Sequence, residues 1–211
     1  MTDDCSSDNT VAILEEYSKK DGWIKHRLLS KNSGVAVARN SSSDMASGRY
    51  ITYLDSDDVW DPTKVELQVM FMVENSSAFS CASCRVIDGS GMDLDKTVKM
   101  LERTDYRGFL LNNLLQTVGI MVDTEKTGRS CLVMPNLRRR QDAATWLQVL
   151  ENDHICYRMS DVLCSYRRVS GSLSSEKCKA AKGVWFLYRK VERLPFLFSC
   201  KCFVRYAVLV V

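Results

Sequence analysis

Residues 31–62 read KNSGVAVARNSSSDMASGRYITYLDSDDVWDP, and this stretch decides the fold. A polar Asn-Ser-Gly turn at 32–34 leads into an apolar run from Val35 to Met45 that we interpret as a helix. After Gly48, the β-branched and aromatic residues at 50–54 predict a short buried strand. A turn, a helix and then a buried strand are typical of an α/β sheet.

Three acidic residues stand directly at the carboxyl end of this strand: Asp55, Asp57 and Asp58. Carboxylates in such a place repel one another and lose hydration, so a hard cation that shares their charge makes the cluster tolerable. Mg²⁺ and Mn²⁺ take oxygen ligands of this kind. In open α/β sheets ligands bind at this edge, and the acidic turn is therefore a candidate metal and ligand site.

The residues of this stretch follow one ordered pattern, Asn32-x-Gly34-x(4)-Arg39-Asn40 and then Gly48-x-Tyr50-Ile51-x(2)-Leu54-Asp55-Ser56-Asp57-Asp58-x-Trp60-x-Pro62. The pattern resembles the core of the family-2 glycosyltransferases of GT-A fold, of the bacterial surface-polysaccharide type. Its DSDD segment resembles their Asp-x-Asp motif. The resemblance extends over essentially the whole chain and implies a doubly wound α/β sheet that binds a nucleotide-diphosphate sugar.

The resemblance implies a role for four residues on the donor side. Asp55 and Asp57 would hold the ribose and a divalent metal, Mn²⁺ or Mg²⁺, with Asp57 as the metal ligand. Arg39 would pair with a phosphate in bidentate fashion, and Asp4 would contact the nucleotide base. Structural roles stay open beside these, because Arg39 can form an ordinary salt bridge and Asp4 can belong to a helix-capping turn.

Residues 137–147 read LRRRQDAATWL, which places Gln141 and Asp142 at the start of an amphipathic helix. The resembled family has an acidic residue just before an aromatic-rich helix. Inverting sugar transfer needs a general base for the acceptor hydroxyl, and Asp142 would be that base. A carboxylate stabilised by the helix dipole is the structural alternative. The two interpretations are compatible, since such a carboxylate stays ionised.

Two further segments carry weaker candidates. Residues 166–174 resemble a family loop close to the donor phosphates, which implies Arg167 as a nucleotide-sugar ligand and Ser172 as a second one. Asn112 and Asn113 are candidates for acceptor hydroxyls, although asparagines in loops more often cap or turn.

The remaining elements are predicted from periodicity. Residues 23–29 are expected to form a strand, and residues 64–74 a helix that packs on the sheet through its apolar residues Val65, Leu67, Met70 and Phe71. Residues 156–169 are expected to form a hairpin or an edge strand.

Composition restricts the class of protein. The chain has 211 residues, a net charge of +3 with both signs well mixed, and nine cysteines. The mixed charge gives no support for nucleic acid as a partner. The cysteines lack zinc-site spacing, and with an acidic start and no run long enough to span a membrane they predict reduced thiols in a cytoplasmic protein.

We expect two parts, a GT-A domain over residues 1–176 and a helical, amphipathic tail over 177–211. The family's first strand, first helix and most of its second strand have no counterpart before Asp4. We therefore expect a fold truncated at its start, with weak nucleotide binding and no sugar transfer by these 211 residues alone. The tail can lie peripherally on a membrane, contact a partner, or pack as an ordinary core helix.

The function that the resemblance implies is inverting transfer of a sugar from a nucleotide-diphosphate donor to a saccharide or lipid-linked acceptor. The process would be assembly of a surface polysaccharide such as capsule, lipopolysaccharide or a teichoic-type polymer. Two other classes stay open. One is a catalytically inactive remnant that acts only as a binding module. The other is a metal-dependent nucleotidyl or phosphoryl transferase with the same acidic cluster, for which the chain has no P-loop.

Overall fold

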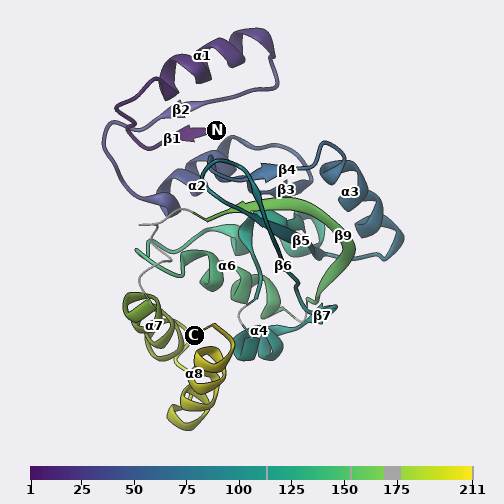
Figure 1. Cartoon of the computed structure of the whole chain (residues 1–211), viewed down its shortest axis with the longest axis vertical. Helices are drawn as coiled ribbons and strands as arrows, with labels where there is room; N and C mark the ends of the chain where they lie inside the picture. Colours follow the sequence, from purple (N-terminus) through teal and green to yellow (C-terminus); the bar gives the residue numbers. More distant parts are fainter. Residues whose placement is uncertain (113, 153, 169–176, 211) are drawn as a thin grey trace.

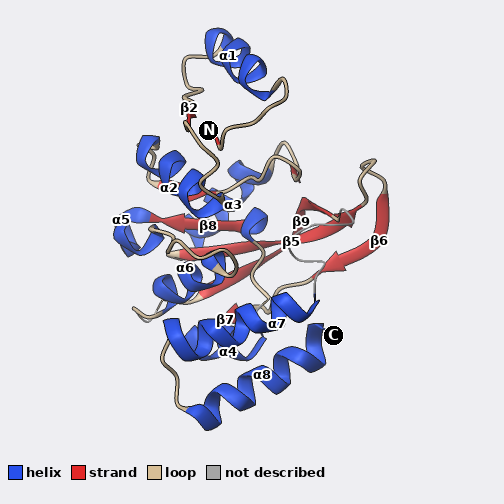
Figure 2. Cartoon of the chain, turned by 90° about the vertical axis from the view of Figure 1, so that its left-hand side faces the viewer, coloured by secondary structure: helices blue, strands red, loops and turns tan. Residues whose placement is uncertain are grey.

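The computed structural model describes residues 1–112, 114–152, 154–168 and 177–210. A seven-stranded mixed sheet forms the centre, and helices cover both of its faces, as Figures 1 and 2 show. A separate two-stranded sheet lies near the amino terminus. The α/β class expected from the sequence is confirmed.

Five strands make the main path of the central sheet, in the order β3, β8, β5, β9, β4. Their bounds are Tyr50–Thr52, Ile120–Asp123, Phe79–Ile87, Cys156–Arg167 and Val59–Trp60 respectively. The two longest, β5 and β9, run parallel, while the pairs β3–β8, β8–β5 and β9–β4 are antiparallel. Two side strands, β6 (Asp93–Val98) and β7 (Arg103–Thr104), pair with β5 and β9.

The sequence-based interpretation of β9 is wrong in one respect. It predicted a hairpin or an edge strand, whereas β9 is one continuous strand with neighbours on both sides. β5 lies on one side, and β4 and β7 lie on the other. Its buried cysteines, Cys156 and Cys164, fill the interior beside β5. All nine cysteines carry free thiols.

The amino-terminal segment lies at the end of the molecule opposite α7 and α8 (Figure 1). It holds β1 (Thr2–Asp3), β2 (Arg27–Leu28) and the helix α1 (Thr10–Lys20). The strand predicted over residues 23–29 is reduced to the two residues that pair in parallel with β1. Trp23 is 90% exposed, so it takes no part in a sheet core.

Helices lie on both faces of the sheet: Gln68 of α3 bonds to Ser80 of β5 on one face, and Trp146 of α6 contacts the neighbouring Phe79 on the other. The helix α2 lies on the side of α6, where Ser43 contacts Tyr53. Short helical turns connect the strands. The bounds of the helices and turns are α2 Val35–Met45, α3 Lys64–Glu74, α4 Tyr106–Asn112, η1 Thr117–Gly119, α5 Thr124–Thr127, η2 Ser130–Leu132, α6 Gln141–Leu150, α7 Lys177–Phe186, η3 Leu187–Val191 and α8 Phe196–Val210. The bounds of α2 and α3 agree with the sequence-based prediction.

The buried face of α3 differs from the prediction. The residues expected to face the sheet include Val65 and Met70, which are 44% and 50% exposed. Instead Lys64, Gln68 and Met72 are buried, at a spacing of four residues along one face. The helix therefore turns a partly polar face inward, toward Ser80 and Gly119, which accept hydrogen bonds from the amide of Gln68.

Two close approaches hold the central strands in place. Trp146 on α6 is fully buried, with its ring 5.8 Å from that of Tyr53 and 6.0 Å from that of Phe79. On the neighbouring turn, a Cβ atom at Gly119 would lie only 2.4 Å from the carbonyl oxygen of Ala82. Only glycine permits this contact between η1 and β5.

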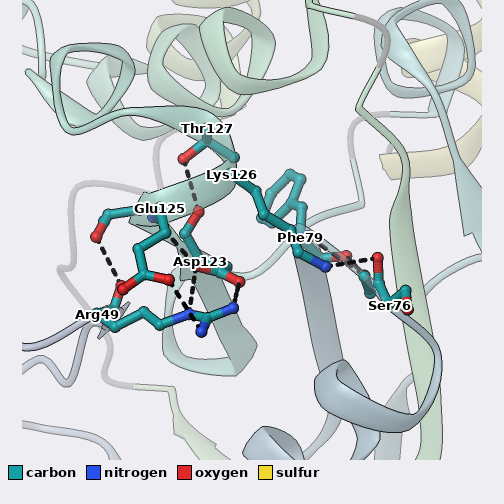
Figure 3. Close-up of polar contacts among 9 residues, drawn as sticks. Arg49, Ser76, Phe79, Asp123, Glu125, Lys126 and Thr127 are labelled. Carbon is teal, nitrogen blue, oxygen red and sulfur yellow. Dashed lines mark hydrogen bonds and ion pairs between the residues drawn. The ribbon is translucent and has the colours of Figure 1, made fainter.

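An ion pair fastens the start of β3 to the end of β8 (Figure 3). The carboxylate of Asp123, 1% exposed, accepts hydrogen bonds from Arg49 Nε at 3.0 Å and Nη2 at 2.7 Å. It also accepts from the backbone N–H of Glu125, whose own carboxylate lies 2.9 Å from Arg49 Nη1. A buried carboxylate is stable only when it is paired with an opposite charge and hydrogen-bonded, so this cluster has a structural role.

The helical tail packs against the sheet domain through polar contacts at 2.6–2.8 Å. Tyr188 donates to the carbonyl of Leu110, and Arg140 donates to the hydroxyl of Tyr206. A division of the chain at residues 176 and 177 remains a prediction. No helix in the described residues is long and apolar enough to cross a membrane.

Candidate functional site

The acidic turn follows β3 directly and leads into β4. Its backbone closes through the N–H of Asp58, which donates to the carbonyl of Asp55 at 3.1 Å. Asp57 is exposed, while Asp55 and Asp58 are partly buried. The sequence-based prediction of acidic side chains at the end of a buried strand is confirmed in its geometry.

Arg39 and Asp55 meet at this turn. Arg39 Nη2 lies 2.7 Å from Oδ1 and 2.5 Å from Oδ2 of Asp55, and its Nε lies 3.2 Å from Oδ1. The arginine side chain is only 12% exposed, and its Nη1 is buried without a hydrogen-bond partner among the described residues. The structure thus brings together two predicted site residues, one from α2 and one from the turn after β3, and one guanidinium nitrogen of Arg39 has no partner among the described residues.

Asp4 contacts the turn at the start of α2. Its two carboxylate oxygens accept hydrogen bonds from the backbone N–H groups of Ser33 at 2.7 Å and Gly34 at 2.8 Å. Gly34 has a φ of +92°, a conformation that favours glycine. Asp4 therefore fixes the loop that orients Arg39, and its predicted contact with a nucleotide base stays a prediction.

Asp57 is the residue whose environment suits a metal ligand. Within the described residues its carboxylate has no hydrogen-bond or ion-pair partner, and no group of three or more His, Cys, Asp or Glu side chains is arranged to hold a metal. Mg²⁺ commonly binds one or two carboxylates and completes its shell with water and substrate phosphates. One free carboxylate beside an arginine fits that arrangement. A metal site made of protein side chains alone does not fit.

Arg167 clamps the acidic turn. Its Nε donates to the carbonyl of Asp57 at 2.6 Å, and its Nη1 donates to the carbonyls of Asp88 at 3.0 Å and Gly89 at 3.3 Å. Its backbone N–H donates to the carboxylate of Asp58 at 2.9 Å. These bonds hold the turn against the end of β9, so in this structure Arg167 positions the turn. Direct contact of Arg167 with a donor stays a prediction.

Asp58 differs electrostatically from its neighbours. Burial raises the pKa of its carboxyl to about 6, and the charges of Asp57 and Asp55 add to the rise. A raised pKa beside a candidate ligand site marks a group that can exchange a proton near neutral pH.

Asp142 stands in the first turn of α6, on another element of the same region. Its Oδ1 accepts from the N–H of Ala143 at 2.8 Å, and the hydroxyl of Thr117 lies 3.4 Å from Oδ2. Thr117 belongs to η1. This turn also contacts β4, the strand after the acidic turn, because the carbonyl of Val118 accepts a hydrogen bond from the indole N–H of Trp60 at 2.9 Å.

Lys64 is a buried lysine beside Trp60 that the sequence analysis did not single out. It is fully buried, donates to the hydroxyl of Thr52 at 3.0 Å, and lies 4.1 Å from the centroid of the Trp60 ring. Burial lowers the pKa of Lys64 to about 8. Its signal in the sequence is weak, because lysine at the second residue after a proline also starts many solvent-facing helices.

Two asparagines of the sequence patterns, Asn112 and Asn40, have structural partners. Asn112 accepts from Arg205 at 3.3 Å and donates to the carbonyl of Gly108 at 2.7 Å, and it therefore ties α4 to α8. Asn40 exchanges hydrogen bonds of 2.8 Å with the backbone of Met134. Asn113 and Ser172 lie outside the described residues.

Comparison with known proteins gives the family. The sequence model of Glycosyl transferase family 2 matches residues 1–130. TuaG of Bacillus subtilis (strain 168), named for teichuronic acid biosynthesis, is 45% identical over 207 residues, which cover 98% of this chain and 81% of TuaG. The Escherichia coli protein WfgD, named as a UDP-Glc:α-D-GlcNAc-diphosphoundecaprenol β-1,3-glucosyltransferase, is 34% identical over 94% of this chain and 78% of its own length.

Solved structures share the fold at low identity. TarS of S. aureus in complex with UDP-GlcNAc has a TM-score of 0.68 at 15% identity, over 98% of this chain and 61% of that one. The mannosyltransferase PcManGT of Pyrobaculum calidifontis, in complex with GDP-Man and Mn²⁺, has a TM-score of 0.64 at 14% identity, over 98% and 59%. The chain thus spans about three fifths of these solved chains. The likeness confirms the GT-A fold expected from the sequence.

Proposed function

The chain belongs to glycosyl transferase family 2, and from this premise we propose that it transfers a sugar from a nucleotide-diphosphate donor to a lipid-linked or saccharide acceptor. The transfer inverts the anomeric carbon and serves the assembly of a surface polysaccharide. The observation that carries the proposal is the ion pair of Arg39 with Asp55, formed next to the exposed carboxylate of Asp57.

On the donor side, each residue has a role that follows from its contacts. Asp55 accepts hydrogen bonds from the ribose hydroxyls, because Arg39 orients its carboxylate. Arg39 offers its unpartnered Nη1 to a phosphate oxygen. Asp4 keeps the loop before α2 in place and contacts the base.

A divalent ion, Mn²⁺ or Mg²⁺, fits at Asp57 and would offset negative charge on the leaving diphosphate. Asp57 is the ligand that this chain supplies. Arg167 supports it indirectly, since its bond to the Asp57 carbonyl fixes the backbone of the turn. The structure of PcManGT, which was solved with GDP-Man and Mn²⁺, supports a metal at this fold's donor site.

On the acceptor side, Asp142 takes the proton of the attacking hydroxyl as that oxygen bonds to the anomeric carbon and the nucleoside diphosphate leaves. It stands in the first turn of α6 and carries a carboxylate, a group that can accept a proton. Thr117, 3.4 Å away, steadies the second carboxylate oxygen. The name of WfgD, which includes a diphosphoundecaprenol acceptor, favours a lipid-linked acceptor for this chain too.

We place the reaction in the cytoplasm, at the membrane surface where a lipid-linked acceptor is accessible. Nine free thiols, five of them buried, suit a reducing compartment.

Product analysis tests the proposal. The protein is incubated with a panel of UDP- and GDP-sugars, Mn²⁺ and a lipid-linked diphosphate acceptor, and the products are identified by mass spectrometry. A sugar on the acceptor together with a free nucleoside diphosphate is the expected result, and it would contradict the expectation from the sequence that these 211 residues do not transfer sugar. Release of sugar 1-phosphate would instead indicate nucleotidyl transfer, and release of a nucleoside monophosphate would indicate transfer of the sugar phosphate. Nucleotide binding without any transfer would favour the binding-module alternative.

A further inference from the structure

One face of α8 is apolar and open to solvent. The side chains that this helix buries follow one another at helical spacing: Ser199, Cys202 and Tyr206. On the outer face, Leu197, Val204 and Val208 are 81%, 63% and 79% exposed. Figure 2 shows α8 as the outermost helix of its end of the molecule. An apolar stripe of this kind on an outermost helix indicates an interaction surface.

A hollow of about 640 Å³ lies beside this stripe, between α8 and the segment formed by α7 and η3. Its apolar walls include Trp185, Phe186 and Phe203, with the Trp185 and Phe203 rings 5.5 Å apart. Three basic residues complete the lining: Lys182, Arg189 and Lys190. An aromatic hollow with basic side chains suits an amphiphile that has an anionic head and an apolar chain.

The carboxyl-terminal segment differs from the rest of the protein in its net charge. Residues 177–211 contain eight Lys and Arg but a single acidic residue, Glu192, whereas the whole chain has 29 basic and 26 acidic residues. Residues 1–176 are therefore net acidic. The carboxylate of Glu192 accepts the hydroxyl of Tyr106 at 2.6 Å and is thus already engaged. The tail is the cationic pole of the molecule.

We propose that α7, η3 and α8 dock the protein on an anionic lipid bilayer. Leu197, Val204 and Val208 enter the boundary between headgroups and acyl chains, and Lys201 lies on the same stripe at the depth of the phosphates. Apolar area together with basic residues gives the two attractions that surface-bound helices need. The aromatic hollow accommodates part of an acyl chain.

A second copy of this chain is a poorer occupant of the same face. Self-association there would bring two cationic poles together, and like charges across an interface oppose binding. The docking surface also rests on no residue of the sugar-transfer site, so it stands or falls separately from the proposed function.

Flotation with lipid vesicles tests the proposal. The protein is mixed with vesicles of phosphatidylcholine alone or of phosphatidylcholine with phosphatidylglycerol, at low and high salt. We expect flotation with the anionic vesicles at low salt and a loss of at least about tenfold in affinity at high salt or without phosphatidylglycerol.

Two exposed-site variants identify the surface. Leu197→Ser/Val204→Ser/Val208→Ser removes the apolar stripe, and its matched control, Val65→Ser/Met70→Ser/Val73→Ser, removes exposed apolar residues of α3. A second variant reverses charge on the tail through Lys182→Glu/Lys190→Glu/Lys201→Glu. Its matched control reverses the charge of three lysines outside the tail, through Lys19→Glu/Lys25→Glu/Lys96→Glu. All six lysines are exposed. Each tail variant should lose at least about tenfold in vesicle affinity, and each control should keep it. Circular dichroism checks that all four variants fold.

Three results would overturn the proposal. The first is equal binding to neutral and anionic vesicles. The second is vesicle binding that survives both tail variants. The third is a wild-type protein that does not bind vesicles but forms a stable dimer in sedimentation velocity, when the Leu197/Val204/Val208 variant is a monomer.

Discussion

The indole N–H of Trp60 donates to the carbonyl of Val118 at 2.9 Å, and this bond joins the two halves of the candidate site. Trp60 ends the segment that begins with the acidic turn, and Val118 follows Thr117, the neighbour of Asp142. This bond thus connects the proposed donor side to the proposed acceptor side, in addition to the sheet itself.

Replacing Trp60 by phenylalanine should separate positioning from binding. Trp60→Phe keeps an aromatic ring over Lys64 but loses the bond to Val118, so η1 and Asp142 gain freedom. We expect kcat to fall by about tenfold while the donor Kd stays nearly unchanged. Trp23→Phe, at a 90% exposed position, is the matched control. A Trp60→Phe enzyme with wild-type kcat would show that the hydrogen bond between Trp60 and Val118 is not needed for turnover.

Asp142→Asn should abolish proton acceptance without loss of shape. Because the general base acts in the transition state, kcat should fall by roughly 10²–10⁴ while donor binding is retained. Steady-state kinetics and donor titrations measure both quantities. Asp161→Asn, at an exposed position, controls for the change of charge. Unchanged turnover in Asp142→Asn would move the base elsewhere, with Asp58 as the next candidate.

Lys64 should make the folding stability depend on alkaline pH. Burial lowers its pKa to about 8 in the folded protein, against about 10.4 for an unfolded chain. Between these values the unfolded chain keeps a proton that the folded protein has released, so stability rises with pH in this window. Over the window the wild-type protein should gain about 3 kcal/mol relative to Lys64→Met.

Urea unfolding at a series of pH values from about 7 to 10.5, under reducing conditions, measures this difference. Lys19→Met, at an exposed position, should keep the wild-type pH dependence. Parallel curves for wild-type and Lys64→Met would contradict a buried lysine with a lowered pKa.

Gly119→Ala should destabilise the fold. The new Cβ would lie 2.4 Å from the backbone oxygen of Ala82, which cannot move without distorting β5. We expect a loss of about 2–4 kcal/mol in the free energy of unfolding. Gly89→Ala, whose Cβ meets nothing within 4 Å, should change stability little. Comparable stability of the two variants would mean that η1 can shift away from β5.

The sequence predicted the acidic turn and its two flanking elements because their signals are local. The turn residues at 32–34 and Gly48 mark the ends of α2 and the start of β3, and the aromatic and β-branched residues identify the strand. The match of residues 31–62 to a family pattern also identified the fold that the solved structures share.

What the sequence could not predict depends on tertiary contacts. The polar inner face of α3 arises because Gln68 finds Ser80 and the carbonyl of Gly119 on other elements. The sequence predicted Arg167 as a ligand of the nucleotide sugar. In the structure its guanidinium donates hydrogen bonds to backbone carbonyls of the acidic turn and of the turn after β5. A pattern along the chain does not reveal such partners.

The most direct measurement for this account is titration of UDP and GDP into the protein by calorimetry, with Mn²⁺ and with chelator, for wild-type and Asp57→Asn. We predict that Mn²⁺ strengthens nucleotide binding by the wild-type protein at least about tenfold, since Asp57 would hold the metal and the metal would offset the charge of the diphosphate. Asp57→Asn should bind as weakly with Mn²⁺ as the wild-type protein does with chelator. Equal affinities of the two proteins in the presence of Mn²⁺ would contradict a donor site at the end of β3.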